Sequence, residues 1–160
     1  MSEIITVGLD LAKNVFQVHG ADAAGRAVLR KKLRRDQVLA FFGQLPACVV
    51  AMEACGGAHF WGREIENIGH DVRLIPPAYV KPFVKRQKND MADAEAICEA
   101  AQRPTMRFVP VKNEETQGSA MVFRIRELLI RQRAQAINAL HGHLGEFGQV
   151  VPQGAGNATR

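Results

Sequence analysis

The sequence has few cysteines and no long apolar run, and both shortages exclude whole classes of protein. Cys48, Cys55 and Cys98 are odd in number and have no paired spacing, which indicates neither a disulfide framework nor a zinc site. Cys48 and Cys55 border an apolar run, so we expect both to be small core residues. No charged start leads into an apolar stretch, and no segment approaches the length of a membrane span. We expect a cytoplasmic protein without a membrane partner.

Size and charge favour one compact domain with a polyanionic partner. The 160 residues suffice for one domain with a core and an appended helix. Lys and Arg number 21 against 16 Asp and Glu, giving a formal charge of +5 and a pI of about 9.4. The basic residues gather at 30–35, at 81–88 and along a late helical segment. This clustering favours nucleic acid as the partner, and the alternative is a set of solvated faces.

The order of apolar patterns predicts an α/β fold. Five strands are expected, at residues 4–9, 15–19, 27–33, 48–52 and 72–75. Three helices are expected among them, at residues 36–42, 58–68 and 91–102. The order βββαβαβα, with three antiparallel strands first, predicts a ribonuclease-H-like mixed sheet flanked by helices. Phe60 and Trp61 are expected in the core beneath the 58–68 helix.

The second part of the chain predicts a linker and one long helix. Residues 104–112 read as an extended linker between the sheet domain, 1–103, and a helix at 113–148. The apolar residues of that helix recur at helical spacing and form one stripe. Because so small a sheet domain could not cover this stripe, we expect a coiled coil with a partner helix. The tail, 149–160, has no closing element, so we expect a truncated end.

Four carboxylates carry the main chemical signal. Asp10 ends the run IITVGLD and Glu53 ends CVVAME, where strands deliver side chains to the rim of a sheet. Asp90 and Asp93 lie three residues apart at the start of a helix and share one face. Oxygen ligands without His or Cys favour Mg²⁺ or Mn²⁺, and two such ions about 3.5–4 Å apart cleave phosphodiesters.

The competing interpretation gives each acid a local structural role. A single Asp after a strand is usually a turn residue, and an acid in the first turn of a helix complements its dipole. That interpretation is weaker for the four acids together, because clustered carboxylates without a cation would repel one another. We therefore predict a metal site at the rim formed by Asp10, Glu53, Asp90 and Asp93.

Seven basic residues are candidates for contact with a nucleic-acid backbone. They are Lys13 in the first hairpin, Arg30, Lys31 and Lys32 on the third strand, and Lys85, Arg86 and Lys88 before the 91–102 helix. For Lys13 a role in the turn itself is the alternative.

Four segments resemble the DEDD transposases, bacterial insertion-sequence recombinases related to the Piv DNA invertases. They are GLDLAKNVF, MEACGG, NDMADAEAI and RELLIRQRAQAINALHGHLGEFG, and the resemblance extends from about Ile4 to Gly154. It implies a RuvC-like domain in which the four acids are the catalytic metal-binding quartet, and a long helix that forms a coiled-coil homodimer or higher oligomer. It also implies excision and insertion of a mobile DNA element, guided by a structured RNA.

The family's second domain, which supplies a nucleophilic serine, has no counterpart in this chain. Ser2 and Ser119 are the only serines, and neither lies in a comparable context. We therefore expect an N-terminal fragment that does not complete recombination alone.

Three other functions share parts of this pattern. A Holliday-junction-resolvase-like nuclease would use metal-activated water and needs no serine domain. A non-catalytic module would bind RNA or DNA through the basic segments and recruit a partner through the long helix. A sugar-kinase-like or actin-like ATPase is set aside, because DLAKN, between the first two strands, lacks the glycine of a phosphate turn.

Overall fold

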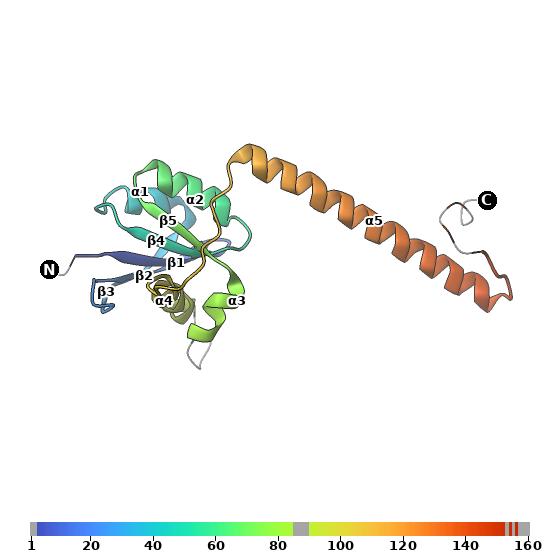
Figure 1. Cartoon of the computed structure of the whole chain (residues 1–160), viewed down its shortest axis with the longest axis horizontal. Helices are drawn as coiled ribbons and strands as arrows, with labels where there is room; N and C mark the ends of the chain where they lie inside the picture. Colours follow the sequence, from blue (N-terminus) through green and yellow to red (C-terminus); the bar gives the residue numbers. More distant parts are fainter. Residues whose placement is uncertain (1–2, 85–89, 153, 155, 157–160) are drawn as a thin grey trace. The chain divides into compact units, whose positions relative to one another are not determined.

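The computed structural model describes residues 3–84, 90–152, 154 and 156. The chain divides into two units, Met1–Asn113 and Glu114–Arg160, which are described separately below. The first contains the sheet and the helices packed on it, and the second is dominated by one long helix (Figure 1).

Five strands form one mixed sheet in the first unit. They are β1 (Thr6–Asp10), β2 (Val15–Ala21), β3 (Ala27–Arg34), β4 (Val49–Glu53) and β5 (Asp71–Ile75). Their order is β3-β2-β1-β4-β5, with β1, β2 and β3 antiparallel in succession and β1, β4 and β5 parallel. This confirms the predicted ribonuclease-H-like mixed sheet, and each strand limit lies within two residues of its prediction.

Helices cover both faces of this sheet. They are α1 (Val38–Phe42), α2 (Ala58–Asn67), α3 (Pro77–Val80) and α4 (Asp90–Ala101), with short 3-10 turns η1 (Arg35–Gln37) and η2 (Lys81–Phe83). α1 and α2 lie on one face, and α3 and α4 lie on the other (Figure 1).

Large side chains fill the space between the sheet and α1 and α2. Phe16 and Trp61 meet edge to face, with ring centroids 5.1 Å apart. Phe42, from α1, is fully buried in the same cluster. The prediction that Phe60 joins this core is wrong, because its side chain is 41% exposed. Successive helical residues differ by about 100° in direction, so Phe60 points away when its neighbour Trp61 faces the sheet.

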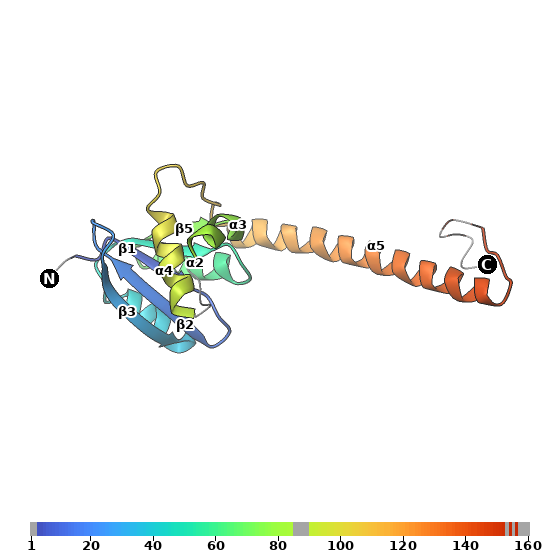
Figure 2. The ribbon, with the colours of Figure 1, turned by 90° about the horizontal axis from the view of Figure 1, so that it is seen from below.

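The other face allows a very close approach between α4 and β1. A Cβ atom at Gly8 would lie 2.1 Å from the carbonyl oxygen of Ala94 and 2.7 Å from the backbone nitrogen of Cys98. Figure 2 shows α4 lying across β1 and β2 on this face. The side chains buried here are mostly small, including Ala51, Ala96 and Ala100. The position of α4 therefore depends on a glycine beneath it.

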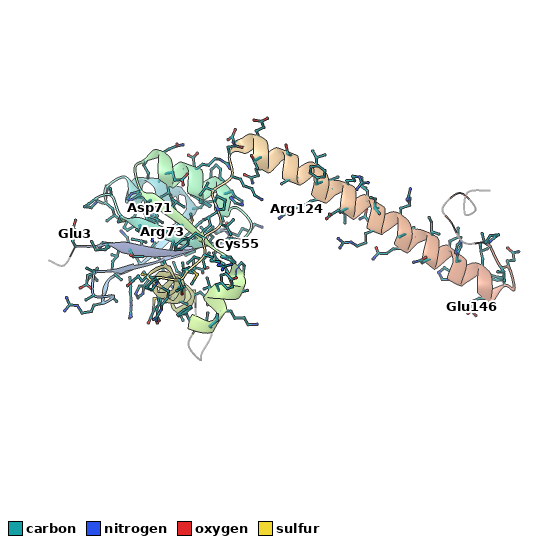
Figure 3. The ribbon with its side chains drawn as sticks, viewed as in Figure 1. Glu3, Cys55, Asp71, Arg73, Arg124 and Glu146 are labelled. Atoms are coloured by element: carbon teal, nitrogen blue, oxygen red, sulfur yellow. The ribbon has the colours of Figure 1, made fainter. Side chains whose placement is uncertain are left out.

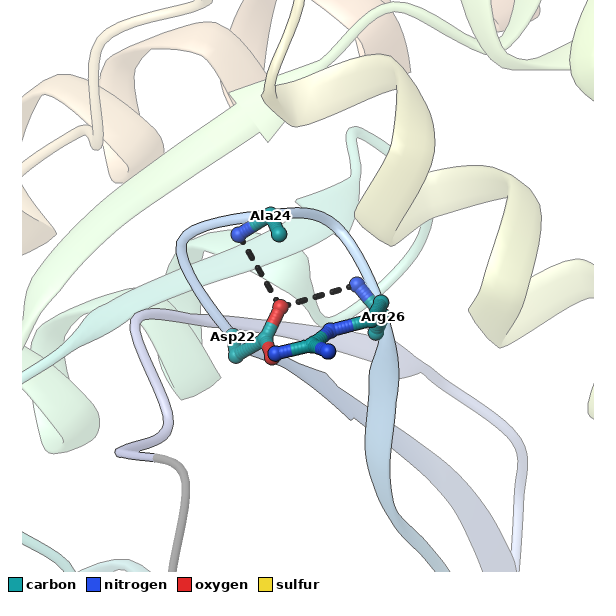
Figure 4. A network of polar contacts seen from close by, with 3 residues as sticks. All are labelled: Asp22, Ala24 and Arg26. Carbon is teal, nitrogen blue, oxygen red and sulfur yellow. Dashed lines mark hydrogen bonds and ion pairs between the residues drawn. The ribbon is translucent and has the colours of Figure 1, made fainter.

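The turn between β2 and β3 is held by one carboxylate (Figure 4). The Asp22 Oδ1 atom accepts hydrogen bonds from the backbone N–H groups of Ala24, at 2.9 Å, and Arg26, at 3.0 Å. The backbone hydrogen bond from Arg26 is the main cause that lowers the pKa of Asp22. Gly25, at φ 75°, supplies the left-handed residue that this turn needs.

The segment expected as a linker, 104–112, is attached to the sheet unit. The Val109 N–H donates a 2.8 Å hydrogen bond to the Leu74 carbonyl, and Val109 packs against the α1 and α2 core. The Arg63 guanidinium also donates to the Lys112 carbonyl, at 2.8 Å. These contacts explain why the compact unit extends to Asn113.

The second unit contains α5 (Glu114–Glu146), a helix of 33 residues. None of its described residues is buried, and many of its apolar side chains are exposed. They include Met121, Val122, Phe123, Ile125, Leu128, Leu129 and Leu140. Within the described part of the chain, no helix combines the length and the apolar character required to span a bilayer.

Candidate functional site

Asp10 and Glu53 meet at one edge of the sheet. β1 and β4 are parallel neighbours, with Leu9 aligned to Met52. Asp10 directly follows Leu9, and Glu53 directly follows Met52. Both side chains are half-buried. Parallel neighbouring strands deliver their last residues to the same rim, so these two carboxylates lie side by side at the end of the sheet.

α4 adds a third carboxylate to this rim. The pKa of Glu53 is raised first by burial of its carboxyl and then by the negative charge of Asp93. Asp93 precedes Ala94, the residue whose carbonyl lies directly above Gly8. Gly8 is two residues before Asp10, so the glycine that admits α4 also brings Asp93 towards the ends of β1 and β4. The sequence did not reveal this role of Gly8.

Asp90 begins α4, three residues before Asp93. Residues at this spacing lie on the same face of a helix. The side chain of Asp90 lies outside the described residues.

Cys55 lies beside the acids, and the prediction that it is a core residue is wrong. Its side chain is exposed, and its Sγ–H donates a 3.7 Å hydrogen bond to the Gly56 carbonyl. β4 ends at Glu53, so Cys55 belongs to the turn that leads out of the sheet (Figure 3). Partial removal of water from around the thiol, followed by the charges of Glu53 and Asp10, raises its pKa. The thiol therefore experiences the negative charge at this rim.

The chemistry of these side chains fits a hard divalent cation. Among the described side chains, no three from His, Cys, Asp or Glu are grouped closely enough to hold a metal ion. The donors at the rim are nevertheless carboxylate oxygens, which Mg²⁺ and Mn²⁺ prefer. Burial is the main cause of the raised pKa of Glu53, and the negative charge of Asp93 is the second cause, which a cation would offset.

Lys13 lies in the connection that leaves this rim. It is exposed in the connection from the end of β1 to the start of β2, next to the end that carries Asp10. Lys85, Arg86 and Lys88 lie outside the described residues.

The basic residues of β3 divide between its two faces. The Arg30 guanidinium forms a 3.6 Å ion pair with Glu95 of α4. The Lys31 ammonium lies 5.0 Å from the centroid of the Phe41 ring, on the α1 side. Side chains alternate along a strand, so Lys32 shares the face of Arg30. The three therefore do not form one continuous basic surface.

Comparison with protein families gives one match that covers most of the chain. The family model described as "Transposase", of the IS110-type DEDD transposases, matches residues 7–148.

Curated relatives have similar descriptions. The chain is 55% identical over 153 residues to a "Probable family 20 transposase" of Pseudomonas aeruginosa, covering 96% of this chain and 45% of that protein. It is 46% identical to the "Transposase for insertion sequence element IS1328" of Yersinia enterocolitica, covering 96% and 46%. It is 41% identical to the "Transposase for insertion sequence element IS1111A" of Coxiella burnetii, covering 97% and 43%. The chain spans less than half the length of these relatives.

Among solved structures, this chain is similar in fold to T. thermophilus RuvC in complex with a Holliday junction substrate. The superposed region covers 67% of this chain and 100% of the RuvC chain. The TM-score is 0.47 and the sequence identity 12%.

Proposed function

Because the chain belongs to the IS110-type family of DEDD transposases, we propose that its sheet unit is the catalytic domain of a transposase that cleaves DNA phosphodiesters with divalent metal. One observation carries this proposal. Two carboxylates end adjacent parallel strands, and a third, from α4, acts electrostatically on one of them. This observation supports a rim to which three segments distant in the sequence contribute acids.

The proposed ligands of Mg²⁺ or Mn²⁺ are Asp10, Glu53, Asp90 and Asp93. Such ions, when bound, activate an attacking oxygen and stabilise the leaving oxygen of a phosphodiester. The protein holds the carboxylates in place through the ends of β1 and β4 and through the contact of α4 with Gly8. Lys13, exposed next to the same rim, supplies positive charge to a phosphate there.

The finer activity and the partners are also proposals. We propose that the complete protein excises and inserts a mobile element under the direction of a structured guide RNA. The curated relatives are more than twice as long as this chain, which supports the view that strand exchange needs residues beyond it. The exposed apolar residues of α5 support pairing of this helix with a second copy.

Metal binding by this chain tests the proposed site. We expect Mn²⁺ to bind the wild-type chain, as followed by electron paramagnetic resonance, and Asp93→Asn to weaken binding at least tenfold. Asp71→Asn is the matched control, because Asp71 begins β5 at the opposite end of the sheet and is exposed. Equal Mn²⁺ affinity in wild type and Asp93→Asn would refute a metal site that includes Asp93.

Cleavage assays separate the remaining functions. Metal-dependent nicking of branched DNA by this chain alone, abolished by Asp10→Asn, would indicate a resolvase-like nuclease. Nucleic-acid binding that survives Asp90→Asn and Asp93→Asn, together with no Mn²⁺ binding by wild type, would indicate a non-catalytic module. Strand exchange by this chain alone would refute the need for further residues.

A further inference from the structure

A recess lies at the C-terminal end of α4, opposite the end that carries Asp90 and Asp93. Its volume is about 690 Å³. One wall comes from α3 and η2, through Tyr79, Pro82 and Phe83, and the other from the segment 103–107 that follows α4. From Asp93 to Ala101 the helix rises about 12 Å, so the recess is separate from the acidic rim.

Flat side chains dominate this recess. Tyr79 is the only tyrosine of the chain, and it is 45% exposed. Phe83 packs against the cluster beneath α4, and the Arg103 guanidinium lies over its ring, 5.2 Å from the centroid. An ion pair with Glu99, one helical turn earlier, fixes Arg103 in this position. The result is a preformed platform of an aromatic ring and a guanidinium plane beside an exposed phenol.

The recess is also positively charged. Arg107 lies in its wall and Lys81 next to it, and both are exposed, whereas the charge of Arg103 is offset by its ion pair with Glu99. This combination suits a ligand that is flat and anionic. Nucleobases stack on aromatic rings and on guanidinium planes, and their phosphates bind cations.

A second arginine–phenylalanine pair shows what distinguishes this recess. Arg73 lies over the Phe108 ring at 5.3 Å, in a recess along β5. Two hydrogen bonds from the Arg73 guanidinium to Asp71, at 2.9 and 3.0 Å, neutralise it, and Glu66 adds another acid. Because it has the same stacking chemistry without net positive charge, this pair provides a matched control.

We propose that the recess between η2 and the end of α4 binds one unstacked nucleobase of a single-stranded nucleic acid. The base stacks against Tyr79 and the Arg103–Phe83 pair, and Arg107 and Lys81 contact its phosphates. This inference depends on the proposed function in one respect, namely that the partner of the protein is a nucleic acid. None of the four acids forms it, and of the basic segments predicted from the sequence only 81–88 reaches it, through Lys81.

Binding of short single strands to the 160-residue chain tests this site. Fluorescence anisotropy with labelled 12-nucleotide strands, in EDTA, measures affinity without involving the metal. We expect Tyr79→Ala to weaken binding about tenfold, within the range measured for loss of one stacked base, and Arg107→Ala to weaken it and to reduce its salt dependence, because a phosphate contact is lost. Tyr79→Phe should bind as wild type, and Arg73→Ala and Phe108→Ala should leave affinity unchanged. Comparing DNA and RNA strands of the same sequence shows whether the bound base comes from DNA or from RNA.

An abasic strand separates stacking from charge. Wild type and Tyr79→Ala should bind it with equal affinity, because only a base can use the phenol ring. Photo-crosslinking of a strand that carries 5-iodouracil should label Tyr79, a readout that unfolding of a variant could not produce.

Three results would overturn the inference: no binding of either strand by wild type, unchanged affinity in Tyr79→Ala, or equal loss with normal and abasic strands. Competition by polyglutamate as strong as that by the strand would assign the recess to acidic peptides instead. Each of these results leaves the Mn²⁺ measurement on Asp93→Asn untouched, so failure of this site is distinguishable from failure of the proposed catalytic function.

Discussion

The two faces of the sheet are packed by opposite means. On the α1 and α2 face, large side chains such as Phe16, Phe42 and Trp61 fill the space between helix and strand. On the α4 face, small residues and Gly8 let the helix backbone approach β1 directly. Large apolar side chains contribute most to stability through the area they bury, whereas close backbone contact fixes the position of a helix. We infer that the first face stabilises the unit and the second positions the acids.

Truncation on the α1 and α2 face should have the largest effect on stability. Phe16→Ala removes a fully buried ring that contacts Trp61, and we expect a loss of about 3–5 kcal/mol in the free energy of unfolding. Urea denaturation measures it, and Val15→Ala, next along β2 but exposed, is the control. A loss below about 1 kcal/mol would contradict the division of roles between the faces.

Adding a methyl group on the α4 face should lower the free energy of unfolding less than truncation on the other face does, but it should weaken metal binding. Gly8→Ala places a methyl group against backbone atoms of Ala94 and Cys98, so α4 must move. We expect a loss of about 1–3 kcal/mol, as for other overpacked sites. We also expect weaker Mn²⁺ binding, because Asp93 moves with the helix. Gly56→Ala is the control, since a Cβ there meets nothing within 4 Å. Unchanged Mn²⁺ affinity in Gly8→Ala would separate the glycine from the site.

Neutralising the charge of Asp93 at the rim should have the smallest effect on the free energy of unfolding. The size of that effect should depend on pH. The folded protein raises the pKa of Glu53, so the free energy of unfolding falls as the pH rises through that value. Asp93→Asn removes one cause of the shift, and burial, the larger cause, remains. We therefore expect the pKa of Glu53 to fall part of the way to its ordinary value.

The variant should accordingly be slightly more stable than wild type near neutral pH, and the difference should vanish in acid. Carbon-13 NMR titration of Glu53 measures the pKa, and urea denaturation at two pH values measures the stability. Asp36→Asn, exposed and next to α1, should change neither. An unchanged pKa of Glu53 in Asp93→Asn would show that the two carboxylates do not interact.

The elements of the fold follow from local patterns, whereas several site features follow from contacts between distant segments. Apolar runs and helical spacing predicted the strands and helices because these patterns are local. The role of Gly8 depends on α4, more than 80 residues later in the chain. The recess beside Tyr79 likewise depends on the segment 103–107. Spacing along the sequence contains no signal for either contact.

Three predictions from the sequence were wrong for local reasons that the sequence itself contains. Phe60 and Trp61 are adjacent on a helix, so only one of them can face the sheet. Cys55 lies two residues after the last residue of β4 and precedes two glycines, which is the signature of a turn rather than of a core position. The alternation of side chains along β3 separates Lys31 from Arg30, although the sequence presents them as one basic run.

The exposure of Cys55 makes it a natural reporter of events at the acidic rim. Cys48 and Cys98 are buried, and burial raises the pKa of each to about 11, so a thiol-selective reagent should modify Cys55 first. After partial desolvation, which is the largest cause, the charges of Glu53 and Asp10 contribute to the raised pKa of the Cys55 thiol. A cation bound among the carboxylates would lower that pKa and so accelerate alkylation. The unmodified protein should therefore signal occupancy of its rim through the rate at which one sulfur atom reacts.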